Sequence, residues 1–166
     1  MKNLDPTPLS GRNPEEPSAL VLRQFRLIFN SVRRHYQSIE KQAGVGGAQI
    51  WALSLITQNP GLAVTPLSQA MDIHQSTASN LVRALLKSGL IQSEKSAHDK
   101  RVVELYPLPA GLKLLKKVQG PYSGMLPQAL GALDPETLQS LGRDLELLIR
   151  TLDVDERAAK IPIALM

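Results

Sequence analysis

The pattern of apolar and polar positions is most regular between residues 62 and 105, where it predicts two short helices followed by a β-hairpin. The first helix is expected over Thr65–Met71 and the second over Gln75–Ser88, with a tight turn between them. Apolar positions in the second helix recur at intervals of three and four, which places them on one face. These positions are Ala78, Leu81, Val82, Leu85 and Leu86.

The opposite face of this second helix is polar. It carries Ser76, Ser79, Asn80, Arg83 and Lys87. Small hydroxyls, an amide and two cations can approach a phosphate backbone and hydrogen-bond to base edges without steric bulk. An amphipathic helix alone is more often just a solvated helix, so the interpretation depends on the segment that comes next in the chain.

The next segment is a basic hairpin. Gly89 is placed to end the helix in a left-handed conformation, and Leu90 and Ile91 begin a strand. Residues 95–101 form a polar tip before a second strand returns over 102–105. Helix, turn, polar-faced helix and charged hairpin in this order predict a winged helix-turn-helix that binds DNA. A winged helix that binds only other proteins is the alternative, and Arg83 and the cationic tip argue against it.

Long amphipathic helices are expected on both sides of this module. Ser18–Ala43 carries one apolar stripe, too extensive for a helix with a single neighbour. Asp134 and Pro135 can cap and start a helix that reaches about Leu152, with leucines at coiled-coil-like spacing. The stripes are Val21, Phe25, Ile28, Val32, Tyr36 and Ile39 in the first, and Leu138, Leu141, Leu145, Leu148 and Leu152 in the second. Burial within one subunit is possible, but the pattern favours a homodimer.

In the remaining segments, glycine and proline mark the expected ends of helices. The cluster at 44–47 ends the first helix; it lacks the lysine, serine and preceding strand of a phosphate-binding loop. A helix is expected over Ala48–Gln58, with Trp51, Leu55 and Ile56 inward, and another begins at Pro109. Gly120–Pro121 should break that helix, and Pro127 is a second expected break.

The predicted fold is therefore mainly α, a winged helix-turn-helix with a two-stranded wing between dimerisation helices. Residues 1–17 are expected to be a mobile tail, 18–43 a dimerisation helix and 44–108 the DNA-binding domain. Residues 109–152 are expected to supply the C-terminal dimerisation helices and 153–166 a C-terminal tail. The apolar end of that tail, Ile161–Met166, is expected to pack on its own or a partner subunit.

Charge distribution adds weight to a polyanionic partner. The formal net charge is +4. Residues 75–101 hold five cations and two acids, whereas residues 134–157 hold seven acids and three cations. A basic front and an acidic rear would orient the protein on DNA.

Other function classes find little support. The chain has no cysteine, which excludes disulfides, thiolate metal sites and thiol chemistry. His35, His74 and His98 are far apart in sequence, and neither a nucleophile elbow nor a phosphate loop occurs, so we expect no enzyme, metal or cofactor. No apolar run is long enough to cross a membrane, and a cytoplasmic protein is expected.

The run LSQAMDIHQSTASNLVRALLKSGLI, followed by SAHDKRVVEL, resembles the MarR family of bacterial transcriptional regulators. The resemblance implies a dimeric winged-helix protein, often released from DNA by small aromatic or phenolic ligands or by oxidation. It places Arg101 in the minor groove, with Asp99 holding the wing in shape. The sequence departs from the family pattern at Ser68, Asp72, Ser93 and Pro107–Pro109.

These patterns indicate two candidate sites, in a protein we expect to repress transcription from a pseudo-palindromic operator on double-stranded DNA. The DNA-binding residues are Thr65, Gln75, Ser76, Thr77, Ser79, Asn80, Arg83, Lys87, Lys95, Asp99, Lys100 and Arg101. By resemblance, a pocket for a small aromatic ligand would be lined by Arg33, His35, Tyr36, Trp51, Tyr122 and Met125. The alternative is that Tyr36 and Trp51 are ordinary core residues. Without cysteine, a thiol-oxidation switch is excluded.

Overall fold

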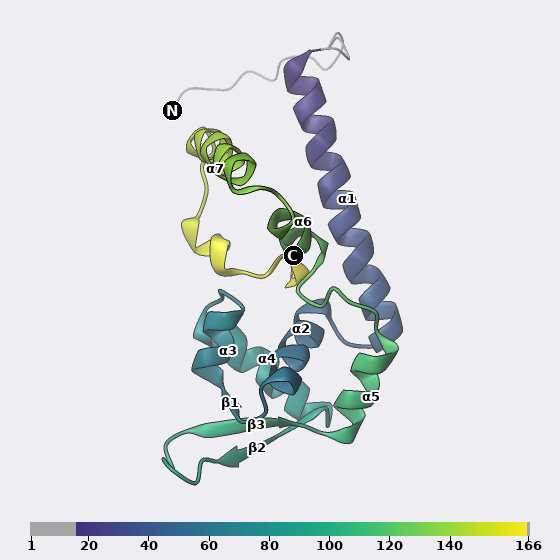
Figure 1. The fold of residues 1–166 in the computed structure, drawn as a ribbon, viewed down its shortest axis with the longest axis vertical. Helices are drawn as coiled ribbons and strands as arrows, with labels where there is room; N and C mark the ends of the chain where they lie inside the picture. Colours follow the sequence, from purple (N-terminus) through teal and green to yellow (C-terminus); the bar gives the residue numbers. More distant parts are fainter. Residues whose placement is uncertain (1–15, 166) are drawn as a thin grey trace.

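The computed structural model describes residues 16–165, which form a mainly helical protein with one small antiparallel sheet (Figure 1). The predicted fold class is confirmed. The helices are α1 (Pro17–Ala43), α2 (Gly47–Gln58), α3 (Val64–Ala70), α4 (Gln75–Lys87), α5 (Pro109–Lys117), α6 (Met125–Gly131) and α7 (Pro135–Arg150), with 3-10 turns η1 (Glu156–Lys160) and η2 (Ile163–Leu165). The strands are β1 (Leu62–Ala63), β2 (Ile91–Lys95) and β3 (Val103–Pro107). Expected helix ends differ by one or two residues.

Helices α2 to α5 and the sheet form the lower part of the molecule in Figure 1, called the lower lobe below. The core lies in this lobe, around α2. Helix α2 is apolar on most sides, as expected for a helix enclosed by others. Ile50, Leu53 and Ile56 are fully buried, and α2 contacts α1, α4, α5 and β3. Trp51 and Leu55, expected to point inward, are only partly buried at the edge of this core.

Helices α3 and α4 form the helix-turn-helix. Ala78, Leu81, Val82 and Leu85 on α4 are buried as predicted, whereas Leu86, placed in the same stripe, is exposed. Asp72 in the turn has φ 50°, the only positive φ of a non-glycine among residues 16–165. Asp tolerates this left-handed conformation better than most residues. Gly89 adopts φ 65° after α4, as predicted.

The wing is the predicted two-stranded hairpin of β2 and β3, and the sheet that contains it has one further strand, β1. Strand β3 lies between β1 and β2, pairing antiparallel with both. Leu62 is opposite Leu105, and Ile91 is opposite Pro107. The two-residue β1 was missed because so short a segment shows no alternation, and only its pairing with β3 identifies it.

The chain breaks after α5 as predicted. Helix α5 begins at Pro109 and ends at Lys117, and a loop containing Gly120 and Pro121 leads to α6. The expected second break at Pro127 is wrong. Pro127 is the third residue of α6, where its missing N–H would have had no partner within the helix.

The upper part of the molecule consists of the N-terminal half of α1 and the whole of α7 (Figure 1). Asp134 caps α7 as predicted, accepting hydrogen bonds from the backbone N–H of Glu136 and Thr137. Only Val32 and Ile39 are buried along α1, and none of residues 135–150 is buried. These two helices therefore present apolar faces that one protomer leaves open.

The C-terminal segment turns back onto its own lower lobe. Pro162 is buried, Ala164 packs against the core, and η2 contacts α2. The expected packing of the apolar tail is therefore met only in part, because Ile161, Ile163 and Leu165 are 42%, 40% and 49% exposed. The proposed mobile tail lies outside the described residues up to residue 15, and Pro17 already belongs to α1.

Candidate nucleic-acid interface

The polar face of α4 is open to solvent. Gln75, Ser76, Asn80, Arg83 and Lys87 are exposed, while Thr77 and Ser79 are partly buried. The opposite, apolar face of α4 fixes this orientation, because Ala78 and Leu85 on that side are fully buried in the core. The amphipathic sequence thus fixes which side chains of α4 can reach a ligand.

Hydrogen bonds preorganise two pairs on this face. Gln75 Nε2 donates to Thr65 Oγ1 at 3.0 Å, which ties the start of α4 to the start of α3. Arg83 Nη1 donates to Asn80 Oδ1 at 2.9 Å. Asn80 and Arg83 are both among the DNA-binding residues expected from the sequence. The structure makes them partners, so a change at either one alters the other.

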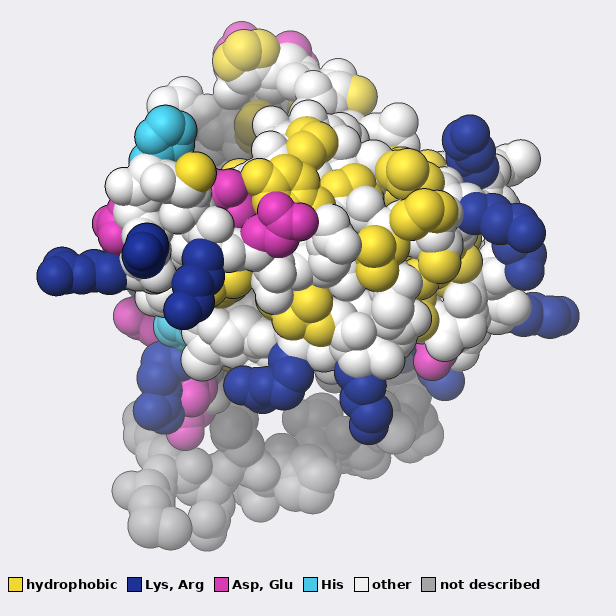
Figure 2. All heavy atoms as spheres, turned by 90° about the horizontal axis from the view of Figure 1, so that it is seen from below, with side chains coloured by type: hydrophobic (Ala, Val, Ile, Leu, Met, Phe, Trp, Pro, Cys, Tyr) yellow, Lys and Arg dark blue, Asp and Glu magenta, His cyan; other side chains and the backbone are white. Residues whose placement is uncertain are grey.

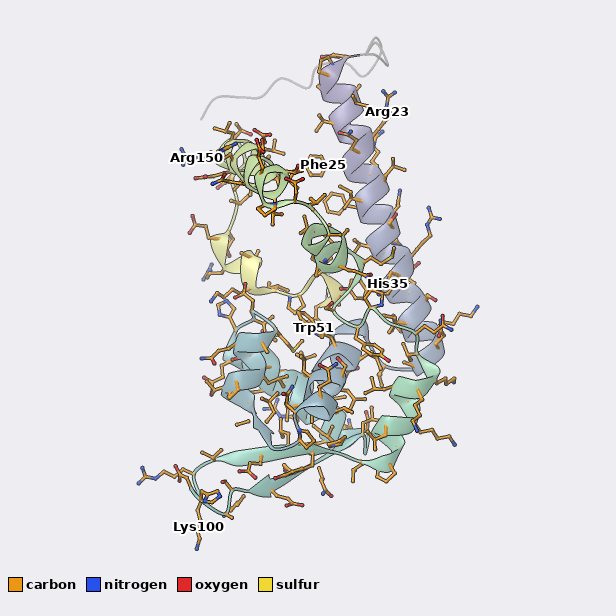
Figure 3. The ribbon with its side chains drawn as sticks, in the orientation of Figure 1. Arg23, Phe25, His35, Trp51, Lys100 and Arg150 are labelled. Carbon is orange, nitrogen blue, oxygen red and sulfur yellow. The ribbon has the colours of Figure 1, made fainter. Side chains whose placement is uncertain are left out.

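The wing carries exposed cations at its tip. Lys95, Lys100 and Arg101 are all exposed, and Figure 3 shows Lys100 at the extremity of the lower lobe. Asp99 Oδ1 accepts a hydrogen bond from the Arg101 backbone N–H at 2.9 Å, and the Asp99 carbonyl accepts one from Val102 N–H at 2.9 Å. Asp99 therefore folds the turn that presents Arg101.

Sequence reasoning missed a polar cluster at the base of the wing. Ser96 is buried, and the Tyr106 hydroxyl donates to Glu104 Oε2 at 2.8 Å. Hydrogen bonds with Ser96 and Tyr106 hold the pKa of Glu104 below its usual value, and the same bond from Tyr106 raises the pKa of that phenol. The available signal was the opposed pair Glu94 and Glu104, whose repulsion favours compensating hydrogen bonds.

Positive side chains dominate the margins of the lower lobe. Figure 2 views this lobe from below and shows Lys and Arg side chains projecting at both sides, with hydrophobic side chains between them. Cations that project from a folded lobe raise the local potential for a phosphate backbone.

The residues expected to bind a small ligand are only partly brought together. Tyr36 and Trp51 line one cavity of about 220 Å³, shared with the turn of the helix-turn-helix, α6 and the C-terminal segment. Tyr122 lines a separate groove, its hydroxyl donating to the Leu115 and Val118 carbonyls at 3.0 and 3.2 Å. Arg33, His35 and Met125 line neither, and His35 Nε2 lies 3.1 Å from the Pro121 carbonyl oxygen.

Tyr36 also has a packing role. An added Cβ at Gly47 or Gly124 would collide with its ring or hydroxyl, so two glycines make room for it. Its hydroxyl donates to the Ser123 carbonyl at 3.3 Å, and burial raises its pKa. Tyr36 thus joins α1 to α2 and to the loop before α6.

The described part of the chain shows neither a metal site nor a membrane-spanning helix. Within residues 16–165, no three His, Asp or Glu side chains cluster in a way that could hold a metal ion. None of the helices in this range combines the length and apolarity needed to cross a membrane.

Sequence comparisons agree with this architecture. A profile described as "MarR family" matches residues 43–102, the span from the end of α1 to the wing. The winged helix belongs to the MarR family. The MarR-type module includes every DNA-binding residue proposed from the sequence. The resemblance noted from the motifs is therefore confirmed.

Two curated relatives extend the match. A Thauera aromatica protein named for transcriptional regulation of the hcr operon is 31% identical over 87 residues, which is 52% of each chain. The HTH-type transcriptional regulator PetP of Rhodobacter capsulatus is 25% identical over 108 residues, 65% of each. The chain thus spans about half of the first relative and under two thirds of the second.

Solved structures share the fold over more of the chain. The S. aureus MepR–DNA complex superposes with a TM-score of 0.55 at 22% identity, covering 79% of this chain and 97% of MepR. Streptococcus pneumoniae FabT in complex with DNA gives a TM-score of 0.55 at 15% identity, covering 83% and 98%. The likeness in fold therefore includes the helices that flank the MarR-type module.

Proposed function

We propose that this protein is a homodimeric, sequence-specific DNA-binding transcriptional regulator that acts as a repressor. The observation that carries the proposal is the joint exposure of the polar face of α4 and a cationic wing tip, whose turn is held by Asp99. A helix of this kind enters the major groove, while an arginine at a hairpin tip suits the narrow minor groove. Two structural neighbours, MepR and FabT, were solved with DNA.

Exposed apolar side chains on α1 and α7 support a dimer. Leu27 and Phe29 on α1 are 68% and 64% exposed, and Leu147 on α7 is 64% exposed. Apolar faces of this extent on monomeric proteins normally mark interfaces. A second copy is the natural partner, because pairing through α1 and α7 leaves both wings free. Such a dimer represses simply by occupying a promoter.

The decisive experiment is selection of genomic fragments by the purified protein, followed by footprinting of the selected sites. We expect a two-fold-symmetric sequence bound in the nanomolar range or tighter, as is usual for specific sites. Arg101→Ala should weaken binding by about 1–3 kcal/mol per dimer, the scale of a good specific contact. Arg101→Lys is the matched control, because it keeps the charge and loses the planar fork.

Recovery of fragments with no shared sequence would contradict sequence-specific regulation. Retention of protein partners but of no DNA would favour the other candidate, a winged helix that binds only proteins.

A small aromatic or phenolic ligand is proposed to release the DNA. It is supported by the cavity that Tyr36 and Trp51 line between α1, α2 and the turn before α4. A ligand that prefers a different spacing of the recognition helices must weaken DNA binding by the same preference. Salicylate-like acids should quench Trp51 fluorescence and release DNA over one concentration range. If a broad panel of aromatic acids changes neither signal, this ligand class is wrong.

A further inference from the structure

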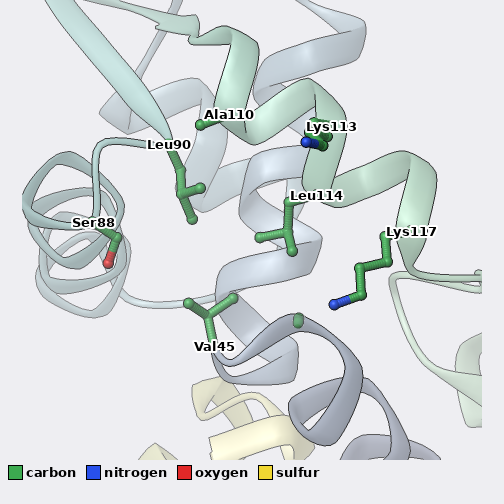
Figure 4. Close-up of a pocket in the computed structure, with 8 residues that line it drawn as sticks. Val45, Ser88, Leu90, Ala110, Lys113, Leu114 and Lys117 are labelled. Atoms are coloured by element: carbon green, nitrogen blue, oxygen red, sulfur yellow. The ribbon is translucent and has the colours of Figure 1, made fainter.

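The base of the wing is anchored by apolar packing. Leu90, directly before β2, is buried and lines a groove of about 540 Å³ together with Val45 and with Leu114 of α5 (Figure 4). The Leu90 carbonyl accepts a hydrogen bond from the Leu108 N–H at 3.0 Å, which joins the two ends of the hairpin. A Cβ at Gly111 would collide with the same carbonyl, so α5 packs directly on this end. The core of the lower lobe thus holds the start of β2 and the end of β3.

The outer part of the wing has no such anchor. Ser96 is the only buried residue between positions 92 and 103, all of which the structure describes. The two valines beside the tip, Val102 and Val103, are 37% and 43% exposed. A two-stranded hairpin on its own is marginally stable in water. The position of Arg101 relative to α4 therefore depends on some other support along the hairpin.

Hydrogen bonds on the outer face of the sheet supply that support. Leu105 on β3 is fully buried, so its neighbours Glu104 and Tyr106 lie on the opposite face, where the Tyr106 hydroxyl donates to Glu104 Oε2 at 2.8 Å. The Ser96 hydroxyl also hydrogen-bonds to the Glu104 side chain, and it is the donor because an ionised carboxylate only accepts. Ser96 Oγ in turn accepts the backbone N–H of His98 at 3.3 Å. One hydrogen-bonded chain thus runs from Tyr106 through Glu104 and Ser96 into the tip.

The inner end of this chain rests on the body of the lobe. A Cβ at Gly61 would lie 3.4 Å from the Tyr106 hydroxyl, so the phenol lies against the turn that precedes β1. Strand β1 leads directly into α3, where Thr65 accepts a hydrogen bond from Gln75 of α4. Tyr106 therefore ties the hydrogen-bonded chain of the wing to the segment that leads into the helix-turn-helix.

We propose that Glu104 is a positioning residue for DNA binding, a role that rests on the proposed function. Its carboxylate holds the outer wing in one orientation relative to α4, and it acts through Arg101 rather than by touching DNA. A tip that is ordered in the free protein loses less conformational entropy on binding. Glu94, directly opposite on β2, carries the same charge, but its carboxylate accepts a hydrogen bond from Gln92 on its own strand.

The two opposed glutamates give a matched pair of variants. Glu104→Ala and Glu94→Ala remove the same atoms and the same charge from one face of the hairpin. If only charge mattered, both would bind operator DNA more tightly. We expect Glu94→Ala to bind at least as tightly as the native protein. Glu104→Ala should bind at least about fivefold more weakly, because a lost hydrogen bond costs about two- to tenfold and each dimer has two wings.

A double-mutant cycle tests whether Glu104 acts through Arg101. In an Arg101→Ala background, Glu104→Ala should weaken operator binding by no more than about twofold, because the side chain that it positions is already absent. Fluorescence anisotropy with a labelled operator measures all four proteins. A loss as large as in the native background would overturn the proposed role.

Tryptic cleavage of the free protein measures the support of the wing without DNA. Trypsin can cut after Lys100 and Arg101 when the hairpin opens, because proteolysis of a folded segment requires local unfolding. The full-length Glu104→Ala protein should be cut there at least about fivefold faster than the native protein, in keeping with the lost hydrogen bonds. Glu94→Ala should be cut at the native rate.

Two variants that leave the charge unchanged complete the test. Ser96→Ala and Tyr106→Phe each remove one donor to Glu104, and each should speed cleavage and weaken operator binding by about two- to tenfold. They decide the matter if circular dichroism shows Glu104→Ala to be unfolded. Equal behaviour of Glu104→Ala and Glu94→Ala in both assays, or native behaviour of both donor variants, would contradict the proposal. Faster cleavage of Glu104→Ala in a protein that binds no operator would refute the proposed function alone.

Discussion

At the scale of single residues, the wing tip shows how one acidic side chain can help a protein bind a polyanion. Asp99 contributes a negative charge where DNA is expected, yet its carboxylate accepts the Arg101 N–H that closes the turn. The hydrogen bond favours DNA binding because it shapes the tip, whereas the negative charge disfavours DNA binding. They can be separated because asparagine keeps the acceptor oxygen and removes the charge.

We expect Asp99→Ala to weaken operator binding and Asp99→Asn to bind at least as tightly as the native protein. The first change loses the hydrogen bond that orders the tip, whereas the second retains it. Fluorescence anisotropy with a labelled operator measures both. Tighter binding by Asp99→Ala would mean that bulk charge, not the shape of the tip, decides.

Asn80 and Arg83 make a second prediction at this scale. Because Arg83 donates to Asn80 Oδ1 at 2.9 Å, their effects on DNA binding should be non-additive in a double-mutant cycle. Replacing either with alanine should also change base preference at fixed positions of the site, since asparagine pairs with adenine and arginine with guanine. Equal losses on all sequences would make the residue a phosphate contact.

At the scale of elements, helix α7 depends on its N-cap. Hydrogen bonds from the Thr137 hydroxyl and backbone N–H lower the pKa of Asp134 from its ordinary 3.8. A lowered pKa in the folded state stabilises that state above the ordinary value, and the contribution is lost as pH falls through the folded pKa. The ionised cap also lies at the positive end of the helix dipole.

The native protein should therefore lose α7 helicity below about pH 4, the region in which a free Asp titrates. Asp134→Asn should lose much of this pH dependence, because the amide oxygen still caps but does not titrate. Far-UV circular dichroism from pH 7 to pH 2.5 tests both. An identical acid transition in the variant would assign the change to other carboxyls.

At the scale of the whole molecule, the open faces of α1 and α7 predict that folding and assembly are coupled. Deletion of Pro135–Met166 should give monomers or aggregates and abolish tight binding to a symmetric site, because it removes one face of the interface. Deletion of residues 156–166 alone is the control and should leave a dimer. Analytical ultracentrifugation distinguishes the two.

The dimer also sets the spacing of the operator. Two linked recognition helices must enter successive major grooves on one side of the DNA, so half-sites should be centred about 10 bp apart. Insertion of about 5 bp between half-sites should abolish tight binding, and insertion of a full turn should restore part of it only if the dimer can stretch. A protein that sediments as a monomer at micromolar concentration and still protects a palindrome would refute this dimer.

Elements whose causes are local can be predicted from the sequence. The stripe of α4, the glycine after it, the prolines that begin α5 and α7 and the Asp134 cap are all explained by periodicity and backbone preferences. The exposure of the cations on the wing and recognition helix can also be predicted from the sequence, because charged side chains are rarely buried in any fold.

Features that depend on residues far apart in the chain follow only from how the elements pack together. These features include the pairing of β1 with β3 and the position of Pro127 in the first turn of α6, where proline does not break the helix. They also include the hydrogen bond from Arg83 to Asn80 and the buried Ser96 beside Glu104. The same packing separates Tyr122 from Tyr36 and leaves a groove beside Lys113 and Lys117. Cavities and cross-strand contacts arise from how whole elements pack, and no local pattern encodes that packing.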